Sequence, residues 1–450
     1  MRSSRTIVAM TATLMLTMSA NASAGTTDSD PVTVKVAIDQ GLEQGAIDSF
    51  NERIAQFEAA NPGIIIEPQE YTWSATTFTA QLAGGTLPDV FTVPFTDGRG
   101  LIERGQIADI SDLMAELPYA NDFNPNLAAL GSDADGNIWA VPIAGYGQGL
   151  HYNRTLFVEA GLDPDNPPTT WAEVREAAQQ IADATGQAGY AQMTQDNTGG
   201  WILTTLVYAL GGRTESVDGE TVTATINTPA MVEALEMIRA MRWDDSSMGF
   251  NFLYDWGTIN QDFAAGRIGM YVSGGGNYGS LFTQNAMNPD DYGLTVVPLQ
   301  GADAGVLTGG TLAAVSATAD EAVQEAALKW IDFFYMEKLT DQAAAVADAQ
   351  TLDDSGQPVG APQLPIFDQA TYEQSVEWVQ QYVNVPVDQM SPYTDHAFDQ
   401  PFVAEPAHAT QAVYAILDPV IQTVLTEENV DIEQLLEQAE TDAQAAIDAG

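Results

Sequence analysis

Aromatic and acidic residues follow three predicted β-strands, each at the point where the strand ends. Asp39 and Glu43 follow the run VTVKVAI, Trp73 follows IIIEPQ, and Phe95 and Asp97 follow VFTV. Ligands of open α/β sheets bind at the carboxyl ends of the strands. Aromatic rings offer apolar faces and carboxylates accept hydrogen bonds, so residues of these types predict a small-molecule site at this edge.

The elements that must position these residues follow from the hydrophobic pattern. Residues 32–38 alternate in polarity as a strand does, and residues 46–60 have the three- and four-residue spacing of an amphipathic helix. A second strand from residue 64, a helix over 75–83 and the VFTV strand follow. The order β-α-β-α-β predicts a parallel sheet with helices on its faces.

The length of the chain predicts more than one such unit, because 450 residues are too many for a single core. We expect two short strands, IWAVPI and GLHYN, separated by a segment rich in glycine, and then a second α/β unit. Residues 300–310 are expected to form a flexible crossing that precedes a strand in TLAAVS.

Residues 1–24 have the pattern of a secretory signal peptide, with two arginines, an apolar stretch and the small residues ANASA. We expect cleavage after Ala22 or Ala24 and a periplasmic product. The chain has no cysteine, which excludes disulfides, thiolate metal sites and a lipid anchor on cysteine. No later apolar run is long enough to span a membrane, so no membrane insertion is expected.

The charge of the chain is strongly negative, at −48 with 62 acidic and 14 basic residues. Such a surface repels nucleic acid and anionic membranes. The acidic residues are spread along the whole chain, which favours a solvated, halophilic surface over a dedicated cation-binding surface. The three histidines are isolated, so neither a metal nor another cofactor is expected.

A series of landmarks gives the chain a resemblance to a known family. In order they are FEAANPGI, AGGTLPDVF, LIERGQIADI, DGNIWAVPIAGYGQGLHYN, PPTTWAEV, FAAGRIGMYVSG, YGLTVVP and EAALKWIDFF. With this order and spacing the sequence resembles the extracellular solute-binding proteins of family 1, the maltose-binding-like proteins of sugar-importing ABC transporters.

The resemblance implies an α/β fold of two lobes, the type II-like periplasmic binding protein fold, with the ligand held in a cleft between the lobes. Hinge glycines fit this expectation, because hinges absorb backbone rotation when lobes close. The expected boundaries are residues 31–143 plus 305–350 for the first lobe, 149–300 plus 365–450 for the second, and 144–148, 300–305 and 351–364 for the hinge segments.

A sugar site needs aromatic rings for the apolar faces of the sugar and polar groups for its hydroxyls. Tyr146 falls where the maltose-binding relative has a ligand-contacting carboxylate, and Asn277 and Tyr278 follow Gly276, which stands where many relatives have a tryptophan. Asp97 could instead form a turn, and Phe95 could be core. The expected ligand-binding residues are Asp39, Glu43, Trp73, Phe95, Asp97, Tyr146, Trp201, Trp256, Asn277, Tyr278 and Gly310.

The resemblance implies a carrier rather than an enzyme. We expect a monomer that binds a sugar or oligosaccharide and delivers it to the permease subunits of an ABC importer. Two alternatives stay open. The same fold could bind a polyamine or another small solute, although an anionic solute is disfavoured by the scarcity of basic residues. A secreted glycoside hydrolase would instead use a pair of carboxylates.

Overall fold

A computed structural model describes residues 31–449 except residues 41, 43, 72, 220, 397 and 398. The expected signal peptide and Glu43 therefore lie outside the described residues. The described chain forms one nine-stranded mixed sheet, in the order β2-β1-β3-β10-β4-β8-β5 with β11 paired to β10 and β9 to β4. A separate hairpin consists of β6 (Glu215–Asp218) and β7 (Thr221–Ala224).

The predicted order of the first elements is confirmed. Strands β1 (Val32–Ile38), β2 (Ile64–Glu70) and β3 (Val90–Pro94) are parallel, and α1 (Gln44–Ala60) and α2 (Ala75–Gly84) connect them. Helix α2 ends because the next residue, Gly85, adopts φ 64°, a left-handed conformation that glycine accepts without steric cost.

Two long strands differ from the prediction. The two runs around residues 138–153 form one strand, β4 (Ala140–Asn153), and the expected crossing at 300–310 contains the start of β10 (Val306–Val315). Glycines in these strands make room for neighbours rather than breaking the strand. A Cβ at Gly147 would lie 2.6 Å from the Phe402 ring, and one at Gly149 would lie 2.8 Å from Leu294.

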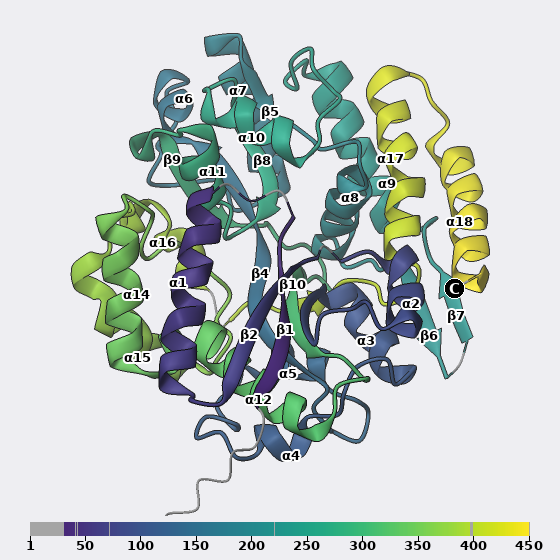
Figure 1. Cartoon of the computed structure of the whole chain (residues 1–450). Coiled ribbons are helices and arrows are strands. Elements are labelled where there is room, and N and C mark those ends of the chain that lie inside the picture. The colour runs from purple at the N-terminus through teal and green to yellow at the C-terminus, as the bar shows by residue number, and fades with distance from the viewer. Residues whose placement is uncertain are drawn as a thin grey trace, which may run out of the picture.

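Strand β4 joins two halves of the sheet. Its first half pairs antiparallel with β10, and its second half pairs with β8 (Ile268–Gly274) and β9 (Tyr292–Val296). In Figure 1, β4 and β10 run between the lower elements, which include β1 and β2, and the upper elements, which include β5 and β8. The remaining strands are β5 (Ala188–Tyr190) and β11 (Phe402–Ala404).

The buried apolar residues form two separate clusters, as a two-lobed fold requires. The first cluster includes Val34, Phe91 and Trp330, and the second includes Leu150 and Phe263. The expected two-lobed α/β fold is thus confirmed. Residues 366 and 367, which lie just inside the range expected for the second lobe, pack in the first cluster.

Helices cover both halves of the sheet. Those of the first half and its C-terminal extension are α3 (Phe95–Glu103), α4 (Ser111–Met114), α5 (Pro125–Ala128), α12 (Glu321–Ile331), α13 (Glu337–Thr340), α14 (Gln342–Asp354) and α15 (Gln369–Val379). The others are α6 (Arg154–Glu159), α7 (Trp171–Thr185), α8 (Thr198–Ala209), α9 (Pro229–Arg239), α10 (Trp256–Ala264), α11 (Tyr278–Asn285), α16 (Ser391–Thr394), α17 (Thr410–Thr426) and α18 (Ile432–Ala449). None of the described helices has the length and apolar character needed to cross a bilayer.

Candidate functional site

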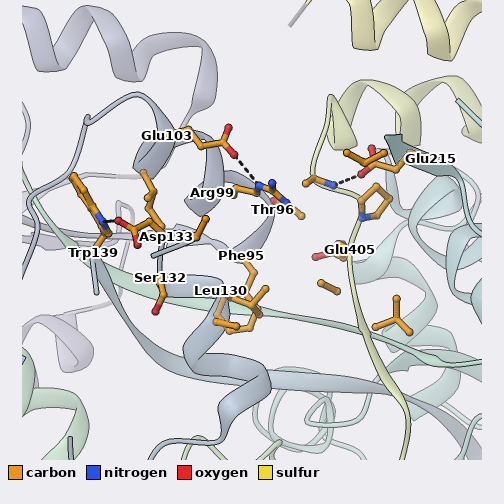
Figure 2. A pocket seen from close by; sticks show the side chains of 18 of the residues that line it. Phe95, Thr96, Arg99, Glu103, Leu130, Ser132, Asp133, Trp139, Glu215 and Glu405 are labelled. Atoms are coloured by element: carbon orange, nitrogen blue, oxygen red, sulfur yellow. Dashed lines mark hydrogen bonds and ion pairs between the residues drawn. The ribbon is translucent and has the colours of Figure 1, made fainter. Parts of the chain in front are cut away.

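Strands β3 and β11 approach each other end to end along β10. Strand β3 runs antiparallel to β10 and ends opposite Thr311, whereas β11 runs parallel to it and ends opposite Thr308. The chain that leaves each strand therefore converges on the two glycines between these positions. Thr96 follows β3 and Glu405 follows β11, and both residues line two neighbouring hollows. Figure 2 shows Thr96 and Glu405 in the larger of the two.

The smaller hollow, which we call the aromatic pocket, has a volume of about 270 Å³. It is lined by four aromatic side chains together with hydroxyl, amide and carboxyl groups. The described residues that line it include no lysine, arginine or histidine. They are Pro94, Thr96, Tyr146, Asp196, Asn197, Thr198, Trp201, Trp256, Gly310, Glu405, Gln411 and Tyr414.

The start of helix α8 brings Trp201 to the aromatic pocket. The carboxylate of Asp418 in α17 accepts hydrogen bonds from the backbone N–H groups of Asn197, at 2.7 Å, and Gly200, at 2.9 Å. A Cβ at Gly200 would lie 2.3 Å from the carbonyl oxygen of Tyr414, so glycine is what lets α8 pack this closely on α17. Asn197 has φ 66°, a strained conformation that these contacts hold in place.

Tyr146 enters the aromatic pocket from strand β4. Its ring lies 5.9 Å from that of Trp201, nearly perpendicular to it. A Cβ at Gly309 would lie 2.1 Å from the Tyr146 hydroxyl, so the glycine provides the space that this side chain occupies. Burial, and then the charge of Glu405, raise the pKa of Tyr146 well above its usual value, so the hydroxyl stays protonated and able to donate a hydrogen bond.

Glu405 is the half-buried carboxyl group at the junction of the two hollows. It accepts a hydrogen bond of 2.9 Å from the Tyr414 hydroxyl. Burial raises the pKa of Glu405 to about 7; the Tyr414 hydrogen bond opposes this shift, and the nearby Asp97 charge adds to it. Near neutral pH the empty pocket therefore holds a carboxyl group that is partly protonated.

Asp97 lies behind the wall of the aromatic pocket rather than on its surface. Its carboxylate accepts a hydrogen bond of 3.1 Å from the Thr96 hydroxyl and another from Trp73. Burial raises the pKa of Asp97, while these two hydrogen bonds and the charge of Arg104 act in the opposite direction. Asp97 thus holds Thr96 and acts on Glu405 through its charge.

Three other expected residues lie outside the aromatic pocket in the first lobe. Asp39 is exposed after β1, and Trp73 is half-buried with its ring 4.9 Å from that of Phe78. Phe95 is buried at the start of α3, lines the larger hollow and packs against Gly310, where a Cβ would lie 2.5 Å from its ring.

Asn277 and Tyr278 lie in the core of the second lobe and line neither hollow. The Asn277 amide donates hydrogen bonds of 2.8 Å to Asn260 and to the Tyr271 hydroxyl. Tyr278 is 1% exposed, and its ring lies 5.0 Å from that of Tyr292. The structure therefore brings together Tyr146, Trp201, Trp256 and Gly310 of the expected residues.

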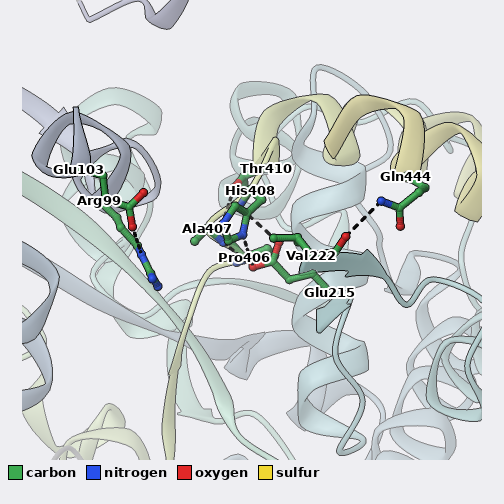
Figure 3. Close-up of polar contacts among 9 residues, drawn as sticks. All are labelled: Arg99, Glu103, Glu215, Val222, Pro406, Ala407, His408, Thr410 and Gln444. Carbon is green, nitrogen blue, oxygen red and sulfur yellow. Dashed lines mark hydrogen bonds and ion pairs between the residues drawn. The ribbon is translucent and has the colours of Figure 1, made fainter. Parts of the chain in front are cut away.

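The larger hollow has a volume of about 780 Å³. On one side, Arg99 pairs with Glu103 at 2.9 Å. On the other, the Glu215 carboxylate accepts hydrogen bonds from the backbone N–H groups of Ala407, at 2.9 Å, and His408, at 3.3 Å (Figure 3). These contacts fix the segment that carries Glu405 to strand β6.

Several residues that line the aromatic pocket were not expected from the sequence. Glu405 lies in an irregular, proline-containing segment, where no periodicity indicates which side chains face inward. Asn197 lies between strand β5 and helix α8, so the same reasoning that selected Asp97 could have found it. Among the described residues, no group of three or more histidine, aspartate and glutamate side chains is arranged to hold a metal ion.

Comparison with known proteins supports this architecture. The family model described as bacterial extracellular solute-binding protein matches residues 43–341. The sn-glycerol-3-phosphate-binding periplasmic protein UgpB of Salmonella typhimurium is 24% identical over 303 residues, covering 64% of this chain and 66% of that protein. UgpB of Agrobacterium fabrum is 26% identical over 215 residues, covering 45% and 47%. The chain thus matches about half to two thirds of the length of these relatives.

Solved structures with the same fold are binding proteins. The cyclic alpha-maltosyl-1,6-maltose binding protein from Arthrobacter globiformis has a TM-score of 0.69 and 26% identity, covering 93% of this chain and all of that one. UgpB from Mycobacterium tuberculosis, solved with glycerophosphocholine, has a TM-score of 0.65 at 19% identity, covering 94% of this chain and 99% of that one. Because the family model spans more than half of the sequence and the fold agrees with it, the chain belongs to the bacterial extracellular solute-binding protein family.

Proposed function

We propose that this protein is the substrate-binding component of an ABC importer and that it binds a sugar or oligosaccharide in the aromatic pocket. The observation that carries the proposal is the composition of this pocket. Tyr146, Trp201, Trp256 and Tyr414 provide aromatic rings for the apolar faces of a sugar. Hydroxyl, amide and carboxyl groups from the same walls suit its hydroxyls.

Binding itself is the activity in this proposal, and no bond is broken. Thr96, in helix α3 after the first-half strand β3, and Trp201, in helix α8 of the second half, both line the aromatic pocket, so a ligand can contact both. A ligand that contacts both lobes only when they are closed stabilises the closed state by its difference in affinity for the two states. Delivery of the solute to permease subunits would follow from recognition of that closed state.

An anionic solute fits the aromatic pocket less well than a neutral one. The curated relatives are named for binding sn-glycerol-3-phosphate. A phosphate group needs positively charged or N–H donors, and Arg is the side chain that usually provides them. Since the described lining of this pocket has carboxyl groups and no basic side chain, charge favours a sugar over a glycerol phosphate.

A polyamine is the second candidate ligand. The carboxyl groups of Asp196 and Glu405 lie in the same pocket as four aromatic rings, and cations bind to both kinds of group. A polyamine would use these groups without needing the hydroxyl and amide groups of Thr96 and Asn197.

The cellular setting is part of the proposal. The leader-like residues 1–24 support a periplasmic location. The charge of −48 supports a protein that works in saline surroundings as a monomer.

Calorimetric titration tests the function directly. Malto- and chito-oligosaccharides, sn-glycerol-3-phosphate and spermidine would be titrated into the protein, and the recovered sugars analysed by chromatography. The proposal predicts binding of at least one sugar series with full recovery of intact sugar. Binding of spermidine alone would favour the second candidate, and appearance of shortened sugars would show an enzyme.

A further inference from the structure

The charge of the aromatic pocket is unbalanced. Asp196 and Glu405 line it, and Asp97 lies close enough behind Thr96 for its charge to act on Glu405. The described lining offers no basic side chain to offset these groups. A partly buried carboxylate without a positive partner is costly, because burial removes water and nothing replaces its solvation.

Glu405 has few partners for its charge. Among the described residues its carboxylate accepts one side-chain hydrogen bond, from the neutral hydroxyl of Tyr414. Asp97 cannot relieve it, since its charge has the same sign. Arg99 and Arg213 line the larger hollow with Glu405, but Arg99 pairs with Glu103 and Arg213 donates to the carbonyl oxygens of Gly212 and Asp303. In the aromatic pocket, a proton or a ligand that carries a positive charge would neutralise Glu405.

The aromatic rings around Glu405 fit the same kind of ligand. Tyr146 and Trp201 lie perpendicular to each other, and Trp256 lines the same hollow. The faces of tyrosine and tryptophan attract cations through the negative charge of the π-system, and the same faces pack on the C–H groups of a sugar ring. The aromatic pocket, with a volume of about 270 Å³, thus offers aromatic faces both for a cation and for the C–H groups of a sugar.

We propose that the solute is a sugar or polyol that carries a protonated amine, and that Glu405 selects it by pairing with this amine. The inference rests on the proposed function, because it names a class of ligand for the same aromatic pocket. The amine would lie between Glu405 and the aromatic rings, while the hydroxyls of the ligand would meet Thr96 and Asn197. The raised pKa of Glu405 agrees with a buried carboxyl group that has no positive partner among the residues lining the aromatic pocket.

Matched sugars test this inference. Chito-oligosaccharides with free amines, the same oligosaccharides with acetylated amines, and malto-oligosaccharides of equal length would be titrated into the full mature chain by calorimetry. The inference predicts that the free-amine series binds at least about tenfold more tightly than both neutral series. Equal or tighter binding of a neutral series would overturn the inference and leave the proposed function standing.

The substitution Glu405→Gln sharpens the test, since it removes the charge and keeps a hydrogen-bond acceptor for Tyr414. We expect the affinity for the free-amine series to fall about tenfold or more, and that for the neutral series to change far less. Glu428→Gln makes the same charge change on an exposed surface residue and should leave both affinities unchanged. Unchanged amine affinity in Glu405→Gln would overturn the inference. Failure of every sugar to bind, with or without an amine, would instead refute the proposed function.

Discussion

Two groups of aromatic side chains in and beside the second lobe differ in their exposure to a ligand. Tyr146 and Trp201 line a pocket that is open to a ligand, whereas Tyr271, Tyr278 and Tyr292 are sealed in a core. The residue types alone do not separate them.

The difference lies in what surrounds each ring. Around Tyr271, the neighbouring Asn260 and Asn277 provide hydrogen-bond partners for its hydroxyl, so the polar group can be buried at little cost. Around Tyr146, Gly309 leaves a space for the hydroxyl, and none of the described residues forms a hydrogen bond with it. The Tyr271 hydroxyl is thus satisfied inside the core, whereas the Tyr146 hydroxyl can still donate a hydrogen bond to a ligand.

Truncation of a core ring should have the largest effect. Tyr278→Ala removes a side chain that is 1% exposed and packs on Phe282 and Tyr292, so it should lower the free energy of unfolding by about 3–5 kcal/mol. Urea denaturation measures this change. The folded fraction should bind ligand as tightly as the unchanged protein, and weaker binding without loss of stability would place Tyr278 in the ligand site.

Truncation of a pocket ring should show the reverse pattern. Trp201→Ala removes a half-buried ring that faces Tyr146, so we expect ligand affinity to fall by roughly 1–3 kcal/mol and stability to change less than in Tyr278→Ala. Calorimetric titration with the sugar that binds best measures the change in affinity. Trp139→Ala, in the wall of the larger hollow, is the matched control and should retain affinity. Equal losses in both variants would mean that the two hollows form a single site.

Glu405 allows the pocket to be tested through its pH dependence. Its pKa is about 7 in the folded chain, above the usual value of 4.5, so the folded state binds the extra proton between these values. The charged carboxylate therefore destabilises the folded state above pH 7, and this cost disappears as the pH falls toward 4.5. Glu405→Gln should stabilise the empty protein by roughly 2 kcal/mol at pH 8, after allowance for screening, and by almost nothing at pH 4.5.

Thermal unfolding of the two proteins across this pH range provides the measurement. A stabilisation that is the same at pH 8 and pH 4.5 would show that the charge of Glu405 is not its cause.

The smallest expected effect isolates the coupling between Asp97 and Glu405. Since the charge of Asp97 raises the pKa of Glu405, Asp97→Asn should lower that pKa by up to about one unit. The stabilisation by Glu405→Gln should then level off at a lower pH, and at a smaller value, in the Asp97→Asn background. An unchanged plateau, reached at the same pH, would show that burial alone raises the pKa of Glu405.

The first half of the sheet was predictable because its signals are local. The alternation in residues 32–38 and the glycines at 84 and 85 set the limits of β1 and α2 without reference to the rest of the chain. Strands β4 and β10 were not predictable as continuous strands. The space beside their glycines is filled by side chains from distant parts of the sequence, such as Phe402 beside Gly147 and Tyr146 beside Gly309.

The aromatic pocket could be predicted only where a residue sits on a regular element. Trp201 and Trp256 stand at the starts of helices, and their position on the hinge side follows from the expected topology. The position of Glu405 in the pocket depends on the pairing of the three-residue strand β11 with β10, and no local sequence pattern indicates that pairing. Asn277 has the side chain expected of a ligand-binding residue, but Asn260 and Tyr271 already occupy its donors.

The long strand β10 has a consequence for how the chain is assembled. In the finished sheet it lies beside β3, yet more than two hundred residues separate the two strands in the sequence. As the chain leaves the ribosome or a translocation channel, strands β8 and β9 of the second lobe emerge before β10. Until β10 emerges, the edge of β3 that pairs with it has no partner. An uncovered edge invites pairing with other chains. The sheet of the first lobe is therefore begun first but completed late. It is complete only when residues 306–315 have been made and have paired with β3.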